Sequence, residues 1–346
     1  MPERRQPPTE TSSPLCLRAL NTAIGRTPLW ITASALVSLM ALVVTLPWFS
    51  WFQDAMDHRY APGSLLVGLD ETFRFDHSVS RTVIEESTRA TGAVMALVAM
   101  LVGVFTAGGW LQVLMERTEG HSLRRFFFGG SRYFFRFLRV LLITILSLSL
   151  LSFVIYGQPW DLLVNELWLG ITDGDLEQLS SELEARRIVF LQDGLYFAGV
   201  ALLLAWGDYT RTRLALHDTR SAVWAGLCTW ALLIVHPLRT LRPLLLLWVI
   251  EASILWAAWH FSMRIESKLG PESGGAAILL LILLGQLVLC WRTIVRGARY
   301  AATTEVSHYY VRPLPRPDPW KEVQVPTLGG PGGPQYPIGD ADQFGV

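Results

Sequence analysis

Long apolar stretches alternate with charged loops along almost the whole chain. Six of these stretches are close to the roughly 20 residues that an α-helix needs to cross the hydrocarbon core of a bilayer, and they carry few charges. The predicted spans are 28–47, 91–115, 137–156, 188–207, 241–261 and 276–295. Because helices satisfy their own backbone hydrogen bonds in lipid, the pattern predicts an all-α, polytopic membrane protein with about six transmembrane helices.

The composition fits a lipid environment. Hydrophobic residues make up 51% of the chain and charged residues 17%, which is more apolar surface than a soluble fold of this length buries. The net charge is zero, so no overall positive field favours nucleic acid as a partner. The cysteines share no short spacing, which argues against a disulfide or zinc framework and predicts small buried side chains at Cys16, Cys228 and Cys290.

Basic residues are distributed unequally between the two sides of the predicted spans. With six spans and both termini on one side, that side receives 21 lysines and arginines and the other side receives 8. The positive-inside rule then places both termini of this multi-pass protein in the cytoplasm. A further apolar stretch, 221–235, is short for a span and predicts an interfacial or re-entrant helix; as a seventh span it would weaken the charge asymmetry.

Two polar, basic turns connect successive spans on the predicted cytoplasmic side, and we call them the first elbow (109–139) and the second elbow (207–242). Each mixes arginines with aromatic or apolar residues, a composition typical of helices that lie among lipid headgroups. The sequence therefore predicts two cytoplasmic interfacial elbow helices. Anionic headgroups would be contacted by four arginines of the first elbow, which are Arg124, Arg125, Arg132 and Arg136.

The two elbows also align with each other. Gly109 corresponds to Gly207, and Phe137 within R-F-L-R corresponds to Pro237 within H-P-L-R. The similarity predicts two-helix repeats at 91–156 and 188–261, and chance similarity between two basic loops is the alternative.

The predicted organisation of the chain has three parts. Residues 1–27 form a cytoplasmic N-terminal arm, and residues 28–299 form the six-helix membrane domain. Residues 300–346 form a cytoplasmic tail that is rich in proline and glycine, and we expect this tail to be disordered.

The second elbow carries the most specific sequence pattern, D-Y-x-R-x-R-L followed by D-x-R-S-A and H-P-L. Its residues are Asp208, Tyr209, Arg211, Arg213, Leu214, Asp218, Arg220, Ser221, Ala222, His236, Pro237 and Leu238. On this motif the chain resembles a family of uncharacterised bacterial polytopic membrane proteins, and it is distantly similar to the glycerophosphodiesterase membrane-domain type. The resemblance covers roughly 28–299. It implies a multi-pass topology in the bacterial inner (plasma) membrane. It implies no activity, because the hydrolytic domain of those phosphodiesterases has no counterpart here.

Three polar residues within predicted spans form a candidate intramembrane polar site, and they are Glu251, Gln286 and Asp193. Glu251 lies near the middle of its span, where an ionised carboxylate costs about 3 kcal/mol on insertion scales. It is therefore either a proton or cation site, or a neutral acid hydrogen-bonded to Gln286 or a serine. Asp193 is closer to the membrane surface, where water can solvate it.

Asp208 begins the polar part of the second elbow. It precedes Arg211 by three residues, on nearly the same helix face. Pairing with Arg239 would instead close the turn. We predict elbow pairing among Asp208, Arg211 and Arg239, with the Asp208–Arg239 pair as the favoured hypothesis.

The sequence contains no H-E-x-x-H, G-x-S-x-G, Walker or Rossmann pattern in a suitable context. We therefore expect no catalytic residues, no metal site and no cofactor. The favoured function is a non-enzymatic integral membrane protein that organises lipid or partner proteins. Its expected partners are membrane lipids and either a second copy of the chain or another membrane protein. The alternative is a transporter or channel subunit with an intramembrane carboxylate site, and an intramembrane enzyme ranks third.

Overall fold

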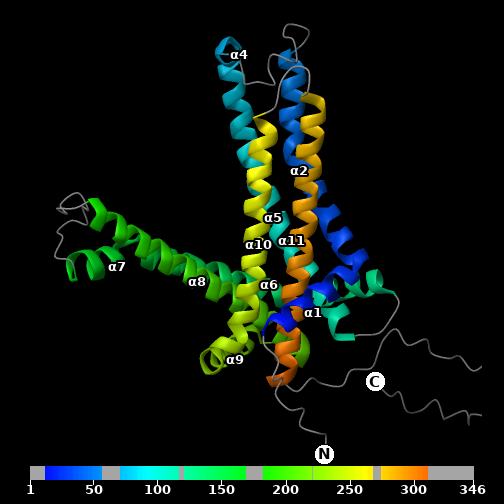
Figure 1. The fold of residues 1–346 in the computed structure, drawn as a ribbon, viewed down its shortest axis with the longest axis vertical. Coiled ribbons are helices and arrows are strands. Elements are labelled where there is room, and N and C mark those ends of the chain that lie inside the picture. Colours follow the sequence, from blue (N-terminus) through cyan, green and yellow to red (C-terminus); the bar gives the residue numbers. More distant parts are fainter. Residues whose placement is uncertain are drawn as a thin grey trace, which may run out of the picture. The chain divides into compact units, whose positions relative to one another are not determined.

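Every regular element in the described part of the chain is a helix (Figure 1). The computed structural model describes residues 12–56, 71–116, 121–168, 182–219, 221–267 and 274–310. The elements are α1 Ser12–Gly25, α2 Thr27–Met56, α4 Glu71–Asp76, α5 Ser78–Glu116, α6 Ser122–Tyr156, α7 Gln158–Trp160, the π-helix η1 Asp161–Glu166, α8 Glu182–His217, α9 Ala222–Val235, α10 Pro237–Glu266 and α11 Gly274–Tyr310. The predicted all-α fold is confirmed.

Six helices are long and apolar enough to cross a membrane, and they are α2, α5, α6, α8, α10 and α11. This number agrees with the prediction and supports a multi-pass membrane protein. The apolar helix α9 has only 14 residues. At about 1.5 Å per residue it reaches about 21 Å, which is short of the roughly 30 Å hydrocarbon core.

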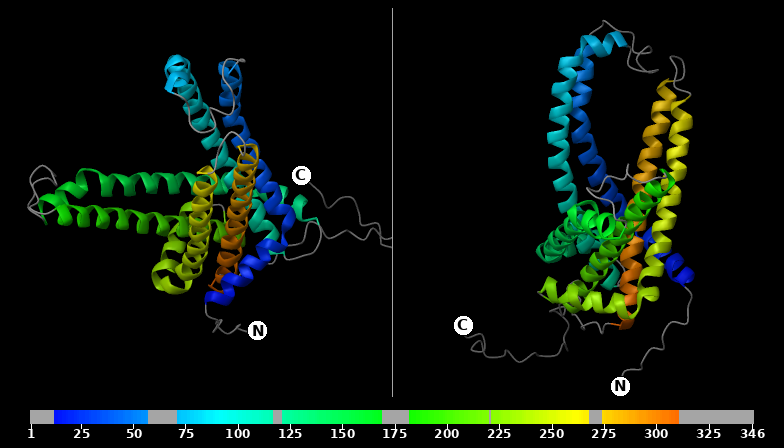
Figure 2. Two further views of the ribbon diagram at one scale, coloured as in Figure 1. Left: turned by 45° about the horizontal axis from the view of Figure 1, so that its top comes forward. Right: turned by 90° about the vertical axis from the view of Figure 1, so that its left-hand side faces the viewer.

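Both elbows lie where the long helices come together, which we call the elbow end (Figure 2). Buried side chains concentrate there. The elbow end comprises 103–114 of α5, 125–144 of α6, 205–216 of α8 and 293–307 of α11. Its largest buried side chains include Trp110, Tyr133, Tyr209 and Tyr300. Towards the opposite end the helices remain apolar but mostly exposed, as expected for surfaces that contact lipid.

Glycines bring α5 and α6 into close contact at the first elbow. A Cβ atom at Gly108 would lie 2.7 Å from the carbonyl oxygen of Gly129, and one at Gly129 would lie 2.7 Å from the carbonyl oxygen of Gly108. The ring of Phe126 fills the space beside Gly109. Small residues of this kind allow two helix backbones to approach closely.

The first elbow differs from its prediction in one respect, because its arginine-rich part is not a separate helix. The residues from Ser122 onward form the first turns of α6, which continues without interruption to Tyr156. The second elbow does contain a separate helix, α9, which is bounded by Ser221 and His236.

Helices occupy both predicted terminal segments next to the membrane domain. The N-terminal arm contains α1, whose side chains Cys16, Ala19 and Ala23 are buried in the core against other helices. The boundary at residue 299 falls inside α11, which continues to Tyr310. The packed face of α1 is apolar, whereas the packed face of α11 beyond residue 299 also buries the polar side chains Thr303, Thr304 and Ser307. Residues 1–11 and 311–346, which include most of the predicted disordered tail, lie outside the described residues.

Candidate functional site

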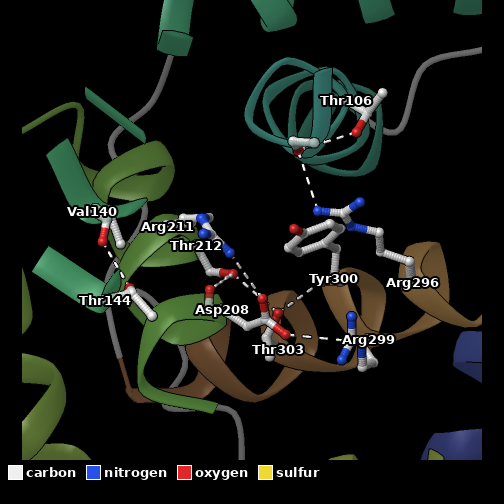
Figure 3. Close-up of polar contacts among 11 residues, drawn as sticks. Thr106, Val140, Thr144, Asp208, Arg211, Thr212, Arg296, Arg299, Tyr300 and Thr303 are labelled. Carbon is white, nitrogen blue, oxygen red and sulfur yellow. Dashed lines mark hydrogen bonds and ion pairs between the residues drawn. The ribbon is translucent and has the colours of Figure 1, made fainter. Parts of the chain in front are cut away.

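A buried carboxylate at the elbow end organises the most polar part of the core (Figure 3). The side chain of Asp208 is only 7% exposed, and its Oδ1 lies 3.2 Å from Nη1 of Arg211 on the same helix face. Its Oδ2 faces α11, where Nε of Arg299 is 3.9 Å away. Asp208 therefore joins α8 to α11 through two guanidinium groups whose side chains are 13% and 18% exposed.

A third arginine extends this cluster towards α5. Arg296 precedes Arg299 by three residues on α11, and its Nη2 donates a hydrogen bond to the carbonyl oxygen of Gly103 at 3.4 Å. The absence of a side chain at Gly103 makes room for this contact, since a Cβ atom there would lie 3.0 Å from Nη2. We refer to Arg211, Arg296 and Arg299 as the arginine cluster.

Buried hydroxyl groups connect the same helices. The hydroxyls of Thr212 on α8 and Thr303 on α11 are 3.0 Å apart, and both side chains are fully buried. Tyr209 donates to the carbonyl oxygen of Thr240 on α10 at 2.9 Å. The site is thus held in place by three helices, each contributing polar groups that are otherwise costly to bury.

Tyr300 contributes a buried hydroxyl beside the arginine cluster. Its side chain is 1% exposed, and the hydroxyl donates to no acceptor among the described residues. The hydroxyl interacts with the Arg296 guanidinium, which can only donate, and Figure 3 shows its ring beside the Arg296 side chain. A buried donor without an acceptor carries the desolvation cost of that group.

The charges around the cluster do not balance. Four guanidinium groups, those of the cluster and of Arg292, lie near two carboxylates, those of Asp208 and Glu251. Glu251 pairs with Arg292 at 3.3 Å and also acts electrostatically on Arg296. The arrangement is suited to holding an anion. The described residues contain no group of three or more histidine, cysteine, aspartate and glutamate side chains that could hold a metal ion.

The structure does not bring the predicted intramembrane polar residues together. Glu251 accepts a hydrogen bond from Arg292 rather than from Gln286. Gln286 instead accepts one from the hydroxyl of Ser38 on α2 at 2.7 Å. Asp193 accepts one from the Tyr156 hydroxyl on α6, also at 2.7 Å. Each polar side chain therefore fastens a different pair of helices.

The elbow pairing is formed in part. Asp208 pairs with Arg211 as the helical spacing predicts, but its second partner is Arg299 and not Arg239. Arg239 donates a hydrogen bond to the hydroxyl of Tyr310, at 3.4 Å. The predicted tail began at residue 300, so a packed surface on this part of α11 was not expected.

The four arginines predicted to contact headgroups occupy different environments. Arg124 is exposed. Arg125 is 4% exposed and lies 3.3 Å from Glu116 at the end of α5. Arg132 and Arg136 both form ion pairs with Asp218, which joins the first elbow to the second. Of the four, Arg124 therefore has the environment that best fits a headgroup contact.

Sequence reasoning missed the contribution of α11 to the site. Arg292, Arg296 and Arg299 recur at intervals of four and three residues, which is the spacing of one helix face. This regular spacing was a usable signal for a functional helix surface. Comparison with protein-family models, with curated proteins and with solved structures finds no match for the chain. The site therefore has to be interpreted from its own geometry.

Proposed function

We propose that this chain is a non-enzymatic integral membrane protein that organises lipid and partner proteins at the cytoplasmic face of the bacterial inner membrane. One observation carries the proposal. Within the apolar windows of the six long helices, only 6–22% of residues are buried inside the protein. Surfaces of this kind are stable when lipid or the helices of other chains cover them.

The distribution of charge supports the orientation in the proposal. The elbow end holds the arginines of both elbows and of α11, and the positive-inside rule assigns such an end to the cytoplasm. The distant resemblance to the glycerophosphodiesterase membrane-domain type is compatible with this topology.

Aromatic side chains on the exposed helix surfaces suggest where partner helices dock. Trp256 and Trp259 of α10 are 64% and 58% exposed, and Phe190 and Phe197 of α8 are 69% and 67% exposed. Aromatic residues contribute strongly to interfaces because each buries a large area at a small entropic cost. A second copy of the chain and a different membrane protein are both compatible with these surfaces.

Extraction of the full chain in native nanodiscs, followed by mass spectrometry, tests the proposal. We expect a stoichiometric membrane protein or a second copy of the chain together with retained lipid. Photo-crosslinkers placed at Trp256 and at the buried position Trp110 provide a matched pair, and only the exposed position should react with the partner. Co-purification of a stoichiometric transport ATPase, or crosslinking at neither position, would overturn the proposal.

A transporter or channel subunit is the second candidate, because Glu251 and Arg292 form an ion pair between two of the apolar helices. Flux measured in liposomes distinguishes the two functions. Transport through this pair predicts a proton-coupled flux that the substitution Glu251→Gln abolishes without lowering expression. A flux that is absent, or unchanged in this variant, would remove the second candidate.

A further inference from the structure

The arginine cluster holds more positive charge than the protein neutralises. With Arg292 included, four guanidinium groups face two carboxylates among the described residues, Asp208 and Glu251, and Glu251 has its own partner in Arg292. Two positive charges therefore remain without a counter-charge in a region where little water can solvate them. Burying unpaired charge is expensive, which favours a bound anion.

Unused hydrogen-bond donors in the same place give independent support. The Nε atom of Arg211 donates no hydrogen bond to the described residues, and that of Arg299 is 3.9 Å from Asp208, beyond hydrogen-bond distance. The buried hydroxyl of Tyr300 interacts with the Arg296 guanidinium but donates to no acceptor among the described residues. These groups come from α8 and α11 and lie near Asp208 (Figure 3). A ligand with several acceptor oxygens would satisfy them together.

We propose that Arg211, Arg296, Arg299 and Tyr300 bind a phosphate group. Guanidinium groups match the oxygens of phosphate in pairs of hydrogen bonds, which makes arginine the usual residue for this recognition. A phosphate monoester or diester carries the one or two negative charges that the cluster requires. Asp208 keeps two of the arginines in position and does not contact the ligand.

The phosphate comes from one of two sources with the same chemistry. An anionic phospholipid headgroup reaches the elbow end from the membrane surface, and a soluble phosphate compound reaches it from water. The first source rests on the proposed lipid-organising function. The binding chemistry itself needs only the cluster, so failure of that function would leave phosphate binding intact.

Thermal unfolding of the purified full chain in micelles of a maltoside detergent, which contains no phosphate, tests the proposal. Inorganic phosphate and phosphatidylglycerol are titrated separately, and the midpoint of unfolding is measured. We expect the midpoint to rise with at least one of them. Stabilisation by phosphatidylglycerol alone identifies the headgroup, and stabilisation by phosphate alone identifies a soluble ligand. No stabilisation by either would overturn the proposal.

Three variants locate the binding site. Arg299→Gln should raise the half-maximal ligand concentration about tenfold or more, and Tyr300→Phe about fivefold, which correspond to a lost charged and a lost neutral hydrogen bond. Tyr300→Phe removes one hydroxyl and keeps the buried ring, so the ligand-free protein should keep its fold. Arg239→Gln, at an exposed arginine of the same end, is the matched control and should respond as the natural protein does.

The variants also separate specific binding from general salt effects. Phosphate stabilises many proteins through exclusion from their surfaces, and this effect acts equally on every variant. A response that is identical in the natural chain, Arg299→Gln and Tyr300→Phe would therefore overturn the proposal.

Discussion

The two elbows have similar sequences but different structures, and a single position accounts for much of the difference. Phe137 of the first elbow lies inside the continuous helix α6, whereas the corresponding Pro237 begins α10. A proline restricts the residue before it to non-helical conformations. His236 accordingly has φ −131° and ψ 54°, and the chain turns there between α9 and α10.

The two elbows are also held in place by different forces. Backbone contact at Gly108 and Gly129 fastens the first elbow. The second depends on the buried charges around Asp208 and on contacts with the end of α11, where the ring of His236 stacks on Tyr310. Related sequences can thus reach a similar turn either by close packing or by charge pairing.

One local feature is shared by both elbows. His121, just before α6, has φ 49°, and Asp218, between α8 and α9, has φ 51°. Histidine and aspartate tolerate this left-handed conformation better than most residues with a side chain. The two residues are not aligned with each other in the proposed repeat, because Asp218 precedes the position that corresponds to His121. The repeat itself stays a prediction.

The largest effect is expected from breaking the charge pairing of the second elbow. Asp208→Asn would leave the arginine cluster without its carboxylate and should lower the free energy of unfolding by about 3 kcal/mol. Glu305→Gln, in an exposed ion pair with Arg18, is the matched control and should cost less than about 1 kcal/mol. Equal losses in chemical unfolding experiments would contradict a buried electrostatic core.

The first elbow should instead be sensitive to added volume. Gly129→Ala places a Cβ atom against the backbone of α5 and should destabilise the protein by about 1–3 kcal/mol. Gly194 of α8 has open space around it, so Gly194→Ala is the control and should be neutral or slightly stabilising. Denaturant midpoints of the two variants provide the comparison, and a neutral Gly129→Ala would argue against close helix contact.

The link between the elbows should contribute less. Asp218→Asn removes both ion pairs with Arg132 and Arg136 while keeping a residue that tolerates positive φ. Because these side chains are partly exposed, the expected loss is about 1 kcal/mol and should shrink at high salt. A double-mutant cycle with Arg136→Gln measures the coupling, and a coupling of zero would remove the link.

Replacing the proline should change geometry more than stability. In Pro237→Ala the restriction on His236 disappears, so α9 should straighten towards α10, at a stability change of about 1 kcal/mol or less. Spin labels at exposed Val223 and Leu245 should move farther apart. Phe137→Ala at the equivalent position of α6 is the control for a continuous helix, and an unchanged distance in Pro237→Ala would show that tertiary contacts fix the turn.

The smallest perturbation uses a thiol beside the second elbow. Cys16 of α1 is 3% exposed and its Sγ donates to the carbonyl oxygen of Pro243 at 3.3 Å. Burial raises the pKa of this thiol, so less thiolate is present at neutral pH and alkylation should need a higher pH. A variant retaining only the less buried Cys228 is the reference. Rapid modification of Cys16 in the folded protein would show that α1 does not dock.

Much of the fold follows from the sequence, because the length of an apolar stretch decides whether it can cross a bilayer. The spans were therefore predictable, and so was the Asp208–Arg211 pair, since it depends on spacing within one helix. The partners of Glu251 and Asp193 were not, because contact between helices depends on their relative rotation and depth. The α11 boundary was missed because the proline-rich residues beyond it dominated the interpretation of that segment.

The position of α11 has a consequence for biosynthesis. This helix follows the other spans along the chain, yet Arg299, Thr303 and Tyr310 complete contacts with α8 and α10. Each earlier span is apolar enough to enter the bilayer as the ribosome delivers it, but their common core stays open until α11 arrives. Membrane insertion and final assembly are therefore separate events. In a nascent chain stalled before α11, the polar side chains of α8 and α10 that α11 normally contacts would be exposed to the cell's proteases.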